Sequence, residues 1–222
     1  MSEFSPVAGV AAVASIHDPM RRSLFDFVTR SGAAVGRDEA AKALGMARGT
    51  AAFHLDRLVD VGLLTTEFQR RSGRTGPGSG RPAKLYRRAI AEVLVSIPER
   101  RYDLVGGLLA SAIEQSDRTG GPMRETLTRV ATERGRDLGA RAASLWAVLE
   151  STGYEPRDDG DGGTVLANCP FHRLAESHTA IICAANLALL RGAAETTNDR
   201  DHEVSFDPGA GRCCVRITAR SE

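Results

Sequence analysis

The pattern that most constrains the fold is a series of three short helical segments in the amino-terminal third of the chain. Asp18 and Pro19 are typical of a helix start, because an aspartate side chain caps the first turn and proline fits the first helical position. Apolar residues then recur at helical spacing. A second helix is predicted over residues 37–44, and Gly45 lies at the bend before a third helix, predicted over residues 47–61. This order predicts a small helical unit built around a helix–turn–helix.

A basic β-hairpin is predicted directly after the third helix. Residues 65–68 and 83–86 are typical of strands, and a tip rich in glycine, proline and serine lies between them. A flexible basic tip suits contact with phosphates or with the minor groove of DNA. The alternative is a solvated loop without a partner. The candidate DNA-contacting residues of this hairpin are Arg70, Arg71, Arg74, Arg81 and Lys84.

The order of these elements resembles the winged helix-turn-helix of ArsR- and MarR-type regulators. That resemblance implies that the third helix lies in the major groove and that its amino-terminal residues contact base edges. The outward candidates are Arg48, Thr50, His54 and Arg57, and the alternative is a solvated helix face. No serine or threonine caps this helix at Ala47, so we expect a loose helix start.

Charge and size fit this interpretation. Residues 1–90 contain 14 Lys or Arg against 8 Asp or Glu, whereas residues 91–222 contain 15 against 20. A basic amino-terminal part favours nucleic acid as a partner. The length of 222 residues suits two small domains. No apolar run reaches the roughly 20 residues of a membrane span, and no basic residue precedes the apolar stretch 7–16. We therefore expect a cytoplasmic protein with reduced thiols and no membrane partner.

All four cysteines lie in the carboxy-terminal quarter of the chain, at Cys169, Cys183, Cys213 and Cys214. Thiolates bind soft metals and iron–sulfur clusters, and a protein commonly supplies three or four of them. The spacing matches no short metal-binding signature. Spacing alone therefore favours the alternative that these cysteines are small buried hydrophobic residues.

Local geometry restricts how these cysteines can meet. A strand predicted over residues 162–167 should end near Cys169, because Pro170 fixes the backbone after it. An unbroken helix from Phe171 would separate Cys169 from Cys183 by roughly 20 Å. A shared centre therefore requires a break near residues 177–179, where Thr179 can cap a second helix.

The last predicted strand covers residues 212–218 and forms a hairpin with residues 203–206. Side chains alternate along a strand, so Cys213 should face inward with its apolar neighbours, and Cys214 should point away. On this basis we expect serine at position 214 to spare a metal centre, and serine at 169, 183 or 213 to abolish it.

The motif Asn168-Cys169-Pro170-Phe171, followed by Leu174-Ala175, Cys183 and Gly211-x-Cys213 before a strand, resembles the sensor domain of the SufR family. These are DeoR/ArsR-like winged-helix repressors of iron–sulfur assembly genes. The resemblance covers most of the chain and implies a [4Fe–4S] cluster bound by Cys169, Cys183 and Cys213. His172 and Cys214 are additional here, and either can complete the site. A set of three cysteines and His172 also suits zinc, which is the alternative cofactor.

Long helical patterns fill the middle of the chain. A helix predicted over residues 97–113 follows the hairpin and resembles a dimerisation helix, although a helix within the core is the alternative. Symmetric DNA half-sites favour a homodimer. A helix over residues 123–143, continued by residues 145–149, contains Gly135 and Gly139, which suggest close helix packing.

We therefore predict an α+β protein with three parts. Residues 1–90 form a winged helix-turn-helix domain, residues 91–118 a dimerisation helix and linker, and residues 119–222 a cysteine-containing sensor domain with a small antiparallel sheet. The predicted function is a DNA-binding regulator, with repression favoured, that responds to redox or iron status. The alternatives are a regulator that responds to zinc and one that responds to a small ligand. An enzyme with Cys169 as nucleophile beside His172 is the least favoured, since the sequence has no glycine-rich phosphate loop and no paired-carboxylate signature.

Overall fold

The computed structural model describes residues 6–69, 82–89, 92–197 and 201–220. The chain divides into two compact units, Met1–Val95 and Ser96–Glu222. Each unit has its own hydrophobic core. No helix within the described ranges is long and apolar enough to cross a lipid bilayer.

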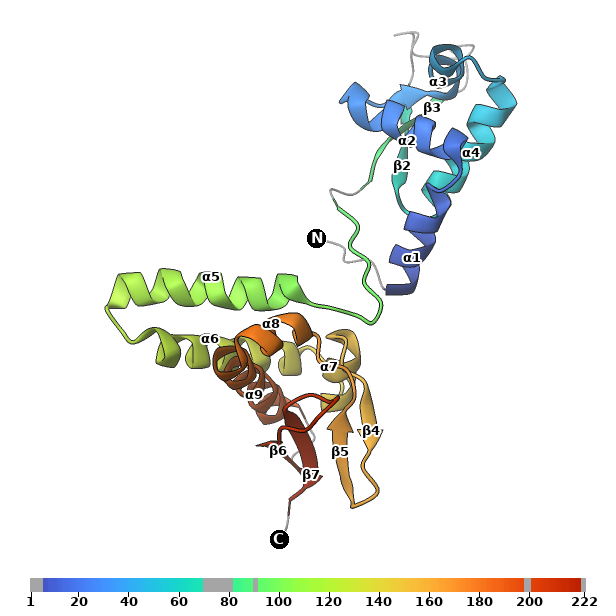
Figure 1. Ribbon diagram of the computed structural model, residues 1–222. Helices are drawn as coiled ribbons and strands as arrows, with labels where there is room; N and C mark the ends of the chain where they lie inside the picture. Colours follow the sequence, from blue (N-terminus) through green and yellow to red (C-terminus); the bar gives the residue numbers. More distant parts are fainter. Residues whose placement is uncertain (1–5, 70–81, 90–91, 198–200, 221–222) are drawn as a thin grey trace. The chain divides into compact units, whose positions relative to one another are not determined.

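The first unit combines a helix-turn-helix with a β-hairpin. Its helices are α1 (Pro6–Ser15), α2 (Pro19–Ser31), α3 (Arg37–Leu44) and α4 (Arg48–Asp60). Its strands are β1 (Val35–Gly36), β2 (Leu64–Gln69) and β3 (Ala83–Arg88), which form an antiparallel sheet in the order β1-β3-β2. The arrangement is that of a winged helix-turn-helix, with β2 and β3 as the wing (Figure 1). The α+β fold class is confirmed.

Local sequence chemistry explains these helix boundaries. The side chain of Asp18 accepts hydrogen bonds from the backbone N–H groups of Met20 and Arg21, at 3.0 Å each, and so caps α2 as expected. Gly45 ends α3 with a left-handed φ of 64°, which costs little at a glycine. Ala47 precedes α4 and supplies no side-chain cap.

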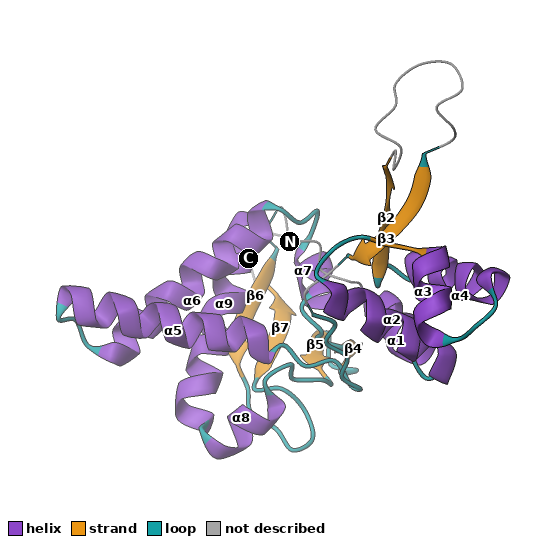
Figure 2. Cartoon of the chain, turned by 90° about the horizontal axis from the view of Figure 1, so that it is seen from above, coloured by secondary structure: helices purple, strands orange, loops and turns teal. Residues whose placement is uncertain are grey.

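Among its described residues, the second unit has five helices and one four-stranded antiparallel sheet. The helices are α5 (Tyr102–Thr119), α6 (Met123–Ala140), α7 (Leu145–Ser151), α8 (His172–Ser177) and α9 (Thr179–Thr196). The strands are β4 (Pro156–Asp158), β5 (Gly163–Leu166), β6 (His202–Phe206) and β7 (Val215–Ala219), in the order β4-β5-β7-β6. Figure 2 shows these strands beside the helices of the unit. Helix α6 packs between α5 and α9, and α9 also lies against β6.

Glycines let α6 and α9 approach until their backbones touch. A Cβ atom placed on Gly135 would lie 1.9 Å from the carbonyl oxygen of Leu189, and one on Gly139 would lie 2.3 Å from that of Ala193. From the other helix, a Cβ atom on Gly192 would lie 2.2 Å from the carbonyl oxygen of Thr132. The close packing expected at Gly135 and Gly139 is confirmed.

Two helix boundaries differ from prediction. The helix predicted over residues 97–113 begins only at Tyr102 and continues to Thr119. Residues 97–101 are not helical, and the backbone N–H of Arg101 donates to the carbonyl of Pro170 at 3.1 Å. Helix α7 does not continue α6, because Ser144 starts a new helix by accepting the N–H of Ala147. Helix α5 shares the core of the second unit with α6.

Candidate functional sites: a helix for DNA contact and a cysteine pocket

The exposed face of α4 has both charged and aromatic character. Arg48 and Arg57 are exposed, and Thr50 is half-buried. The Arg57 guanidinium lies 5.6 Å from the ring centre of Phe53, whose side chain is 57% exposed. Phe53 was missed in the sequence, although it lies between Thr50 and Arg57 at helical spacing. Exposed arginine and an aromatic ring on one helix face suit contact with phosphates and bases.

Not every candidate of α4 is free to point outward. Arg48 forms an ion pair with Asp38 of α3. His54 is half-buried, and its Nδ1 atom is buried without a hydrogen-bond partner among the described residues. The pKa of Asp18 is lowered first by the backbone N–H of Arg21 and also by the charge of nearby His54. The side chain of His54 therefore lies near Asp18, at the start of α2.

On the wing, Lys84 forms an ion pair with Asp56 of α4. Its Nζ atom lies 2.6 Å from Oδ1 of Asp56, and the hydroxyl of Tyr86 donates to the same oxygen at 2.7 Å. This network fixes β3 against the third helix of the helix-turn-helix. The other wing candidates, Arg70, Arg71, Arg74 and Arg81, lie outside the described residues.

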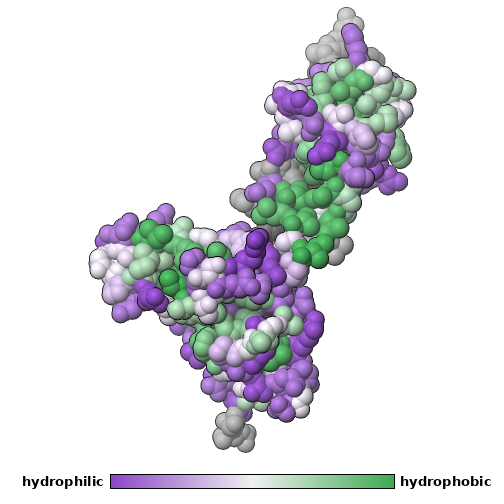
Figure 3. All heavy atoms as spheres, in the orientation of Figure 1, coloured by the Kyte–Doolittle hydropathy of each residue, from purple (hydrophilic) through white to green (hydrophobic). Residues whose placement is uncertain are grey.

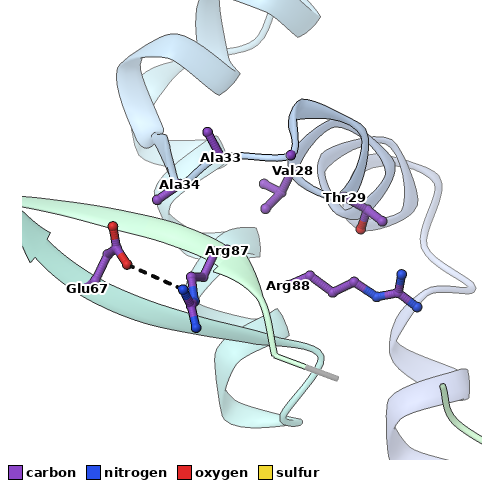
Figure 4. A pocket seen from close by; sticks show the side chains of 8 residues that line it. Val28, Thr29, Ala33, Ala34, Glu67, Arg87 and Arg88 are labelled. Carbon is purple, nitrogen blue, oxygen red and sulfur yellow. Dashed lines mark ion pairs between the residues drawn. The ribbon is translucent and has the colours of Figure 1, made fainter. Parts of the chain in front are cut away.

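A hollow of about 370 Å³ in the first unit lies between the end of α2 and the wing. Figure 4 shows Val28, Thr29 and Arg88 at its edge, with Glu67 and Arg87 paired across the two strands at 3.9 Å. It contains no cysteine, and its charged groups include a formed ion pair. We assign no ligand to it.

The four cysteines line one cavity of about 530 Å³ in the second unit. They arrive from three segments: Cys169 follows β5, Cys183 lies in the first turns of α9, and Cys213 and Cys214 directly precede β7. All four are buried and free of disulfides. The cavity is also lined by Asn168, His172, Arg100 and Arg212, among others. The structure thus brings together cysteines that are up to 45 positions apart in the sequence.

The predicted break between the two helices is confirmed, but it is narrower than expected. Only His178, with φ −134° and ψ 43°, interrupts the helix between α8 and α9. Thr179 does not cap α9, because its hydroxyl donates to the carbonyl of Ala175 at 2.6 Å. The change of direction at His178 brings Cys183 to the cavity that Cys169 also lines.

The expectation that Cys214 points away is wrong. Strand β7 begins at Val215, so the alternation of a strand does not extend to the two cysteines before it. The Nδ2 atom of Asn186 lies 3.1 Å from Sγ of Cys213 and 3.9 Å from Sγ of Cys214. Both sulfur atoms therefore face the same buried amide.

His172 occupies a different environment from the sulfur atoms. Its Nε2 atom lies 3.2 Å from the carboxylate of Glu176, one helical turn later, and its side chain is 52% exposed. It contributes to the rim of the cavity, whereas the cysteines are buried inside.

The sulfur atoms form one hydrogen-bonded group. Hydrogen bonds from Cys169 and Cys214, with a further one from Asn186, lower the pKa of Cys213. The same hydrogen bond to Cys213, together with burial, raises the pKa of Cys169 and that of Cys214. Cys183 also interacts with Cys214 and raises its pKa further. Hydrogen bonds from the neighbouring thiols therefore stabilise the thiolate form of Cys213.

A buried polar pair supports this group from behind. The hydroxyl of Tyr154 donates to Oδ1 of Asn186, which directs the amide nitrogen toward the sulfur atoms. Burial, and then the charges of Cys213, Cys169 and Cys214, raise the pKa of Tyr154 and keep it a donor. Neither residue was predicted. The sequence signal for Asn186 was a polar residue within an otherwise apolar helix, because a buried amide needs hydrogen-bond partners.

Among the described residues, no three His, Cys, Asp or Glu side chains are arranged around the position of a single metal ion. A zinc site needs four donors at about 2.0–2.3 Å from one ion. In a [4Fe–4S] cluster, each thiolate binds a different iron atom. The cysteine sulfur atoms therefore lie farther apart than they do around a single zinc ion. The cavity has four cysteines, which is the number that a [4Fe–4S] cluster commonly takes.

Comparison with known proteins gives one match. Residues 16–67 match a family model described as a helix-turn-helix domain. No curated protein and no solved structure matches the chain. The matched region covers α2, α3 and α4, which form the helix-turn-helix of the first unit, and most of β2, the first strand of the wing. The domain match and this fold together identify the chain as a DNA-binding transcription regulator.

Proposed function

We propose that this regulator is a repressor whose second unit binds an iron–sulfur cluster, of the [4Fe–4S] type, and couples redox or iron status to DNA binding. The observation that carries the proposal is the convergence of four buried cysteines from three chain segments on one cavity. Buried cysteines that only fill a core have no reason to gather. Four thiolates are the usual ligand set of such a cluster.

The surroundings of the cavity support an anionic, sulfur-rich centre. Arg212 lines it, with its Nη2 atom paired with Asp207 at 2.9 Å, and a guanidinium group stabilises negative charge without titrating. The amide of Asn186 donates toward two sulfur atoms, and such hydrogen bonds tune the potential of clusters. The ligands that we propose are Cys169, Cys183, Cys213 and Cys214, with Cys214 in place of His172 as the fourth.

Zinc is the second candidate, since four cysteines also form a common structural zinc site. The version with His172 as a ligand has less support, because this side chain is half exposed and paired with Glu176. A closed zinc site would require the four sulfur atoms to contract around one ion.

We also propose that the regulator is a homodimer formed through the α5 stripe, which we define as Tyr102, Gly106, Leu109 and Ile113. Tyr102 is 38% exposed and Ile113 is 50% exposed, whereas Leu109 is partly buried against the core of the unit. Figure 3 shows hydrophobic atoms at the surface over this helix. A second copy is the occupant that we propose, because helix-turn-helix proteins commonly read two half-sites with two-fold symmetry.

Anaerobic purification tests the cofactor. We expect a brown protein with iron and acid-labile sulfide in equal amounts, close to four of each per chain for a [4Fe–4S] cluster. A colourless protein with one zinc per chain would support the second candidate. A chain that binds neither after reconstitution with iron and sulfide would contradict both and would favour a small apolar ligand.

A further inference from the structure

The segment 96–101, which begins the second unit, lies against the loop that contains Cys169. The backbone N–H of Arg101 donates to the carbonyl of Pro170 at 3.1 Å. Nη1 of Arg100 donates to the carbonyl of Cys169 at 3.1 Å and to Oδ1 of Asn168. The carbonyls of both Cys169 and Pro170 are therefore bound by the segment that precedes α5.

Asn168 completes this contact from the side of the loop. Its side chain is buried, and its Nδ2 atom donates to the carbonyl of Glu99 at 3.0 Å and to that of Gly153 at 2.6 Å. With Arg100 on its oxygen, the amide joins three backbone segments. Breaking one partnership would leave buried polar groups without partners, so the contacts tend to form or break together.

Segment 96–101 also packs closely on the turn at Gly153. This glycine has φ +83°, and a Cβ atom there would lie 2.9 Å from Cγ of Glu99. The segment is thus held at Gly153, Asn168 and Pro170 at once. It is continuous in sequence with residues 92–95, which end the first unit. A change in the loop at Cys169 can therefore reach the DNA-binding unit along the chain.

We propose that Arg100 and Asn168 form a coupling clamp, which transmits the ligation state of Cys169 to segment 96–101 and from there to DNA affinity. The proposal rests on the proposed function, because it requires a centre bound by Cys169. A bond from the Cys169 sulfur to the centre restrains the loop 168–170 and stabilises the clamp. Without that bond the loop has more freedom, and the clamp holds segment 96–101 less firmly. Such coupling needs different contacts in the two states, and the clamp supplies them.

Amide hydrogen exchange of the full chain tests the clamp. The samples are anaerobic protein reconstituted with iron and sulfide, and the same protein after removal of iron by a chelator. In the wild type we expect exchange at residues 99–101 to slow about tenfold on loading. In Arg100→Ala we expect the iron content of the wild type but a difference of less than about twofold. Arg157→Ala is the matched control, because Arg157 is an exposed arginine of the same unit paired with Glu155.

DNA affinity gives the second readout. The probe is a duplex that the wild-type chain itself selects from a random-sequence pool. We expect Arg100→Ala and Asn168→Ala to bind it with nearly the same affinity when loaded and when iron-free, whereas the wild type and Arg157→Ala keep a clear ratio between the two forms. If Arg100→Ala loses iron, Arg100→Lys replaces it in both measurements. Lysine keeps the positive charge at the cavity, but it lacks the planar guanidinium that donates to Asn168 and to the carbonyl of Cys169.

The outcomes separate the two proposals. Variants with full iron content and an unchanged ratio of loaded to iron-free affinity would overturn the clamp and leave the proposed function intact. Loss of iron in both Arg100→Lys and Arg100→Ala would also overturn it, because Arg100 would then act on binding of the centre. A wild-type chain that takes up no iron would overturn the proposed function and the clamp with it.

Discussion

Whether Cys214 binds the cluster decides whether the cysteines supply three ligands or four. Because Cys214 precedes β7 and its sulfur lies near the amide that also faces Cys213, we expect Cys214→Ser to lose most of the bound iron. His172→Ala should keep all of it, since that imidazole pairs with Glu176 at the rim. Iron and sulfide analysis after anaerobic reconstitution measures both variants. Full iron content in Cys214→Ser would show that Cys214 is not the fourth ligand of the cluster.

Asn186 and Tyr154 form the second informative pair of residues. Asn186→Leu leaves the buried hydroxyl of Tyr154 without its acceptor, so we expect the iron-free protein to lose about 1–3 kcal/mol of unfolding free energy. Adding Tyr154→Phe removes the stranded hydroxyl and should recover part of that loss. Urea unfolding of the single and double variants measures the coupling. Strictly additive losses would show that the pair does not act as a unit.

Helices α6 and α9 depend on glycine for their contact. Gly135→Ala places a methyl group 1.9 Å from the backbone oxygen of Leu189, which neither helix can avoid without moving. We expect a loss of about 3 kcal/mol or more in urea unfolding. Gly107→Ala is the matched control, because a Cβ atom at that position of α5 meets nothing within 4 Å. The control should gain about 0.5–1 kcal/mol from helix propensity alone. Equal effects in the two variants would contradict the contact.

The network at Asp56 joins α4 to β3 and gives the first unit a pH dependence. Burial raises the pKa of Asp56, but the hydrogen bonds from Lys84 and Tyr86 outweigh it and leave the pKa lowered. A lowered folded-state pKa contributes stability above the unfolded-state value, near 3.9, and this contribution is lost as pH falls through the folded-state pKa. We expect amide protection in β3 to weaken as pH falls below about 4, and to do so less in Asp56→Asn. An identical pH profile in that variant would exclude this role.

Sequence patterns predicted the elements that depend on local chemistry. Asp18, Gly45 and the break near His178 act through their own turns, and each lies where it was expected. The errors arose where a distant partner decides the backbone. The N–H of Cys213 donates to the carbonyl of Leu166, so the chain is not yet in the β7 ladder at that point. Likewise, segment 96–101 donates to Pro170 instead of entering α5.

The same distinction holds for the cysteine pocket. The three separated cysteines were predicted from the motif that resembles a known sensor domain. Arg100, Asn186 and Tyr154 were not predicted, because their roles arise only when β5, α9 and the segment before α5 meet. Ordinary polar residues have no spacing rule that marks such a role.

At the scale of the whole molecule, the α5 stripe should determine the oligomeric state. Ile113→Glu places a charge within the proposed contact between two copies, and we expect it to convert the dimer to a monomer. Sedimentation or light scattering measures the mass. Iron content should not change, because Ile113 does not line the cysteine cavity. Glu114→Lys is the control, since Glu114 is exposed on the same helix but outside the stripe. A dimeric Ile113→Glu variant would place the interface elsewhere.

DNA affinity should depend on salt through the basic first unit. Residues 1–90 have a net charge of +6, against −5 for the remainder, so contacts with phosphates should come from the first unit. Arg57 is exposed on α4, with Asp60 3.7 Å away and Phe53 beneath its guanidinium. If Arg57 contacts a phosphate, Arg57→Ala should weaken binding at every sequence and reduce the slope of log K against log salt by about one. If it contacts a guanine, the variant should instead lose about 1–3 kcal/mol at one position of the selected duplex. Arg157→Ala removes the same charge from the second unit and should change neither. Unchanged affinity of Arg57→Ala at low salt would exclude Arg57 from the interface and would leave Arg48 and the wing as the source of the salt dependence.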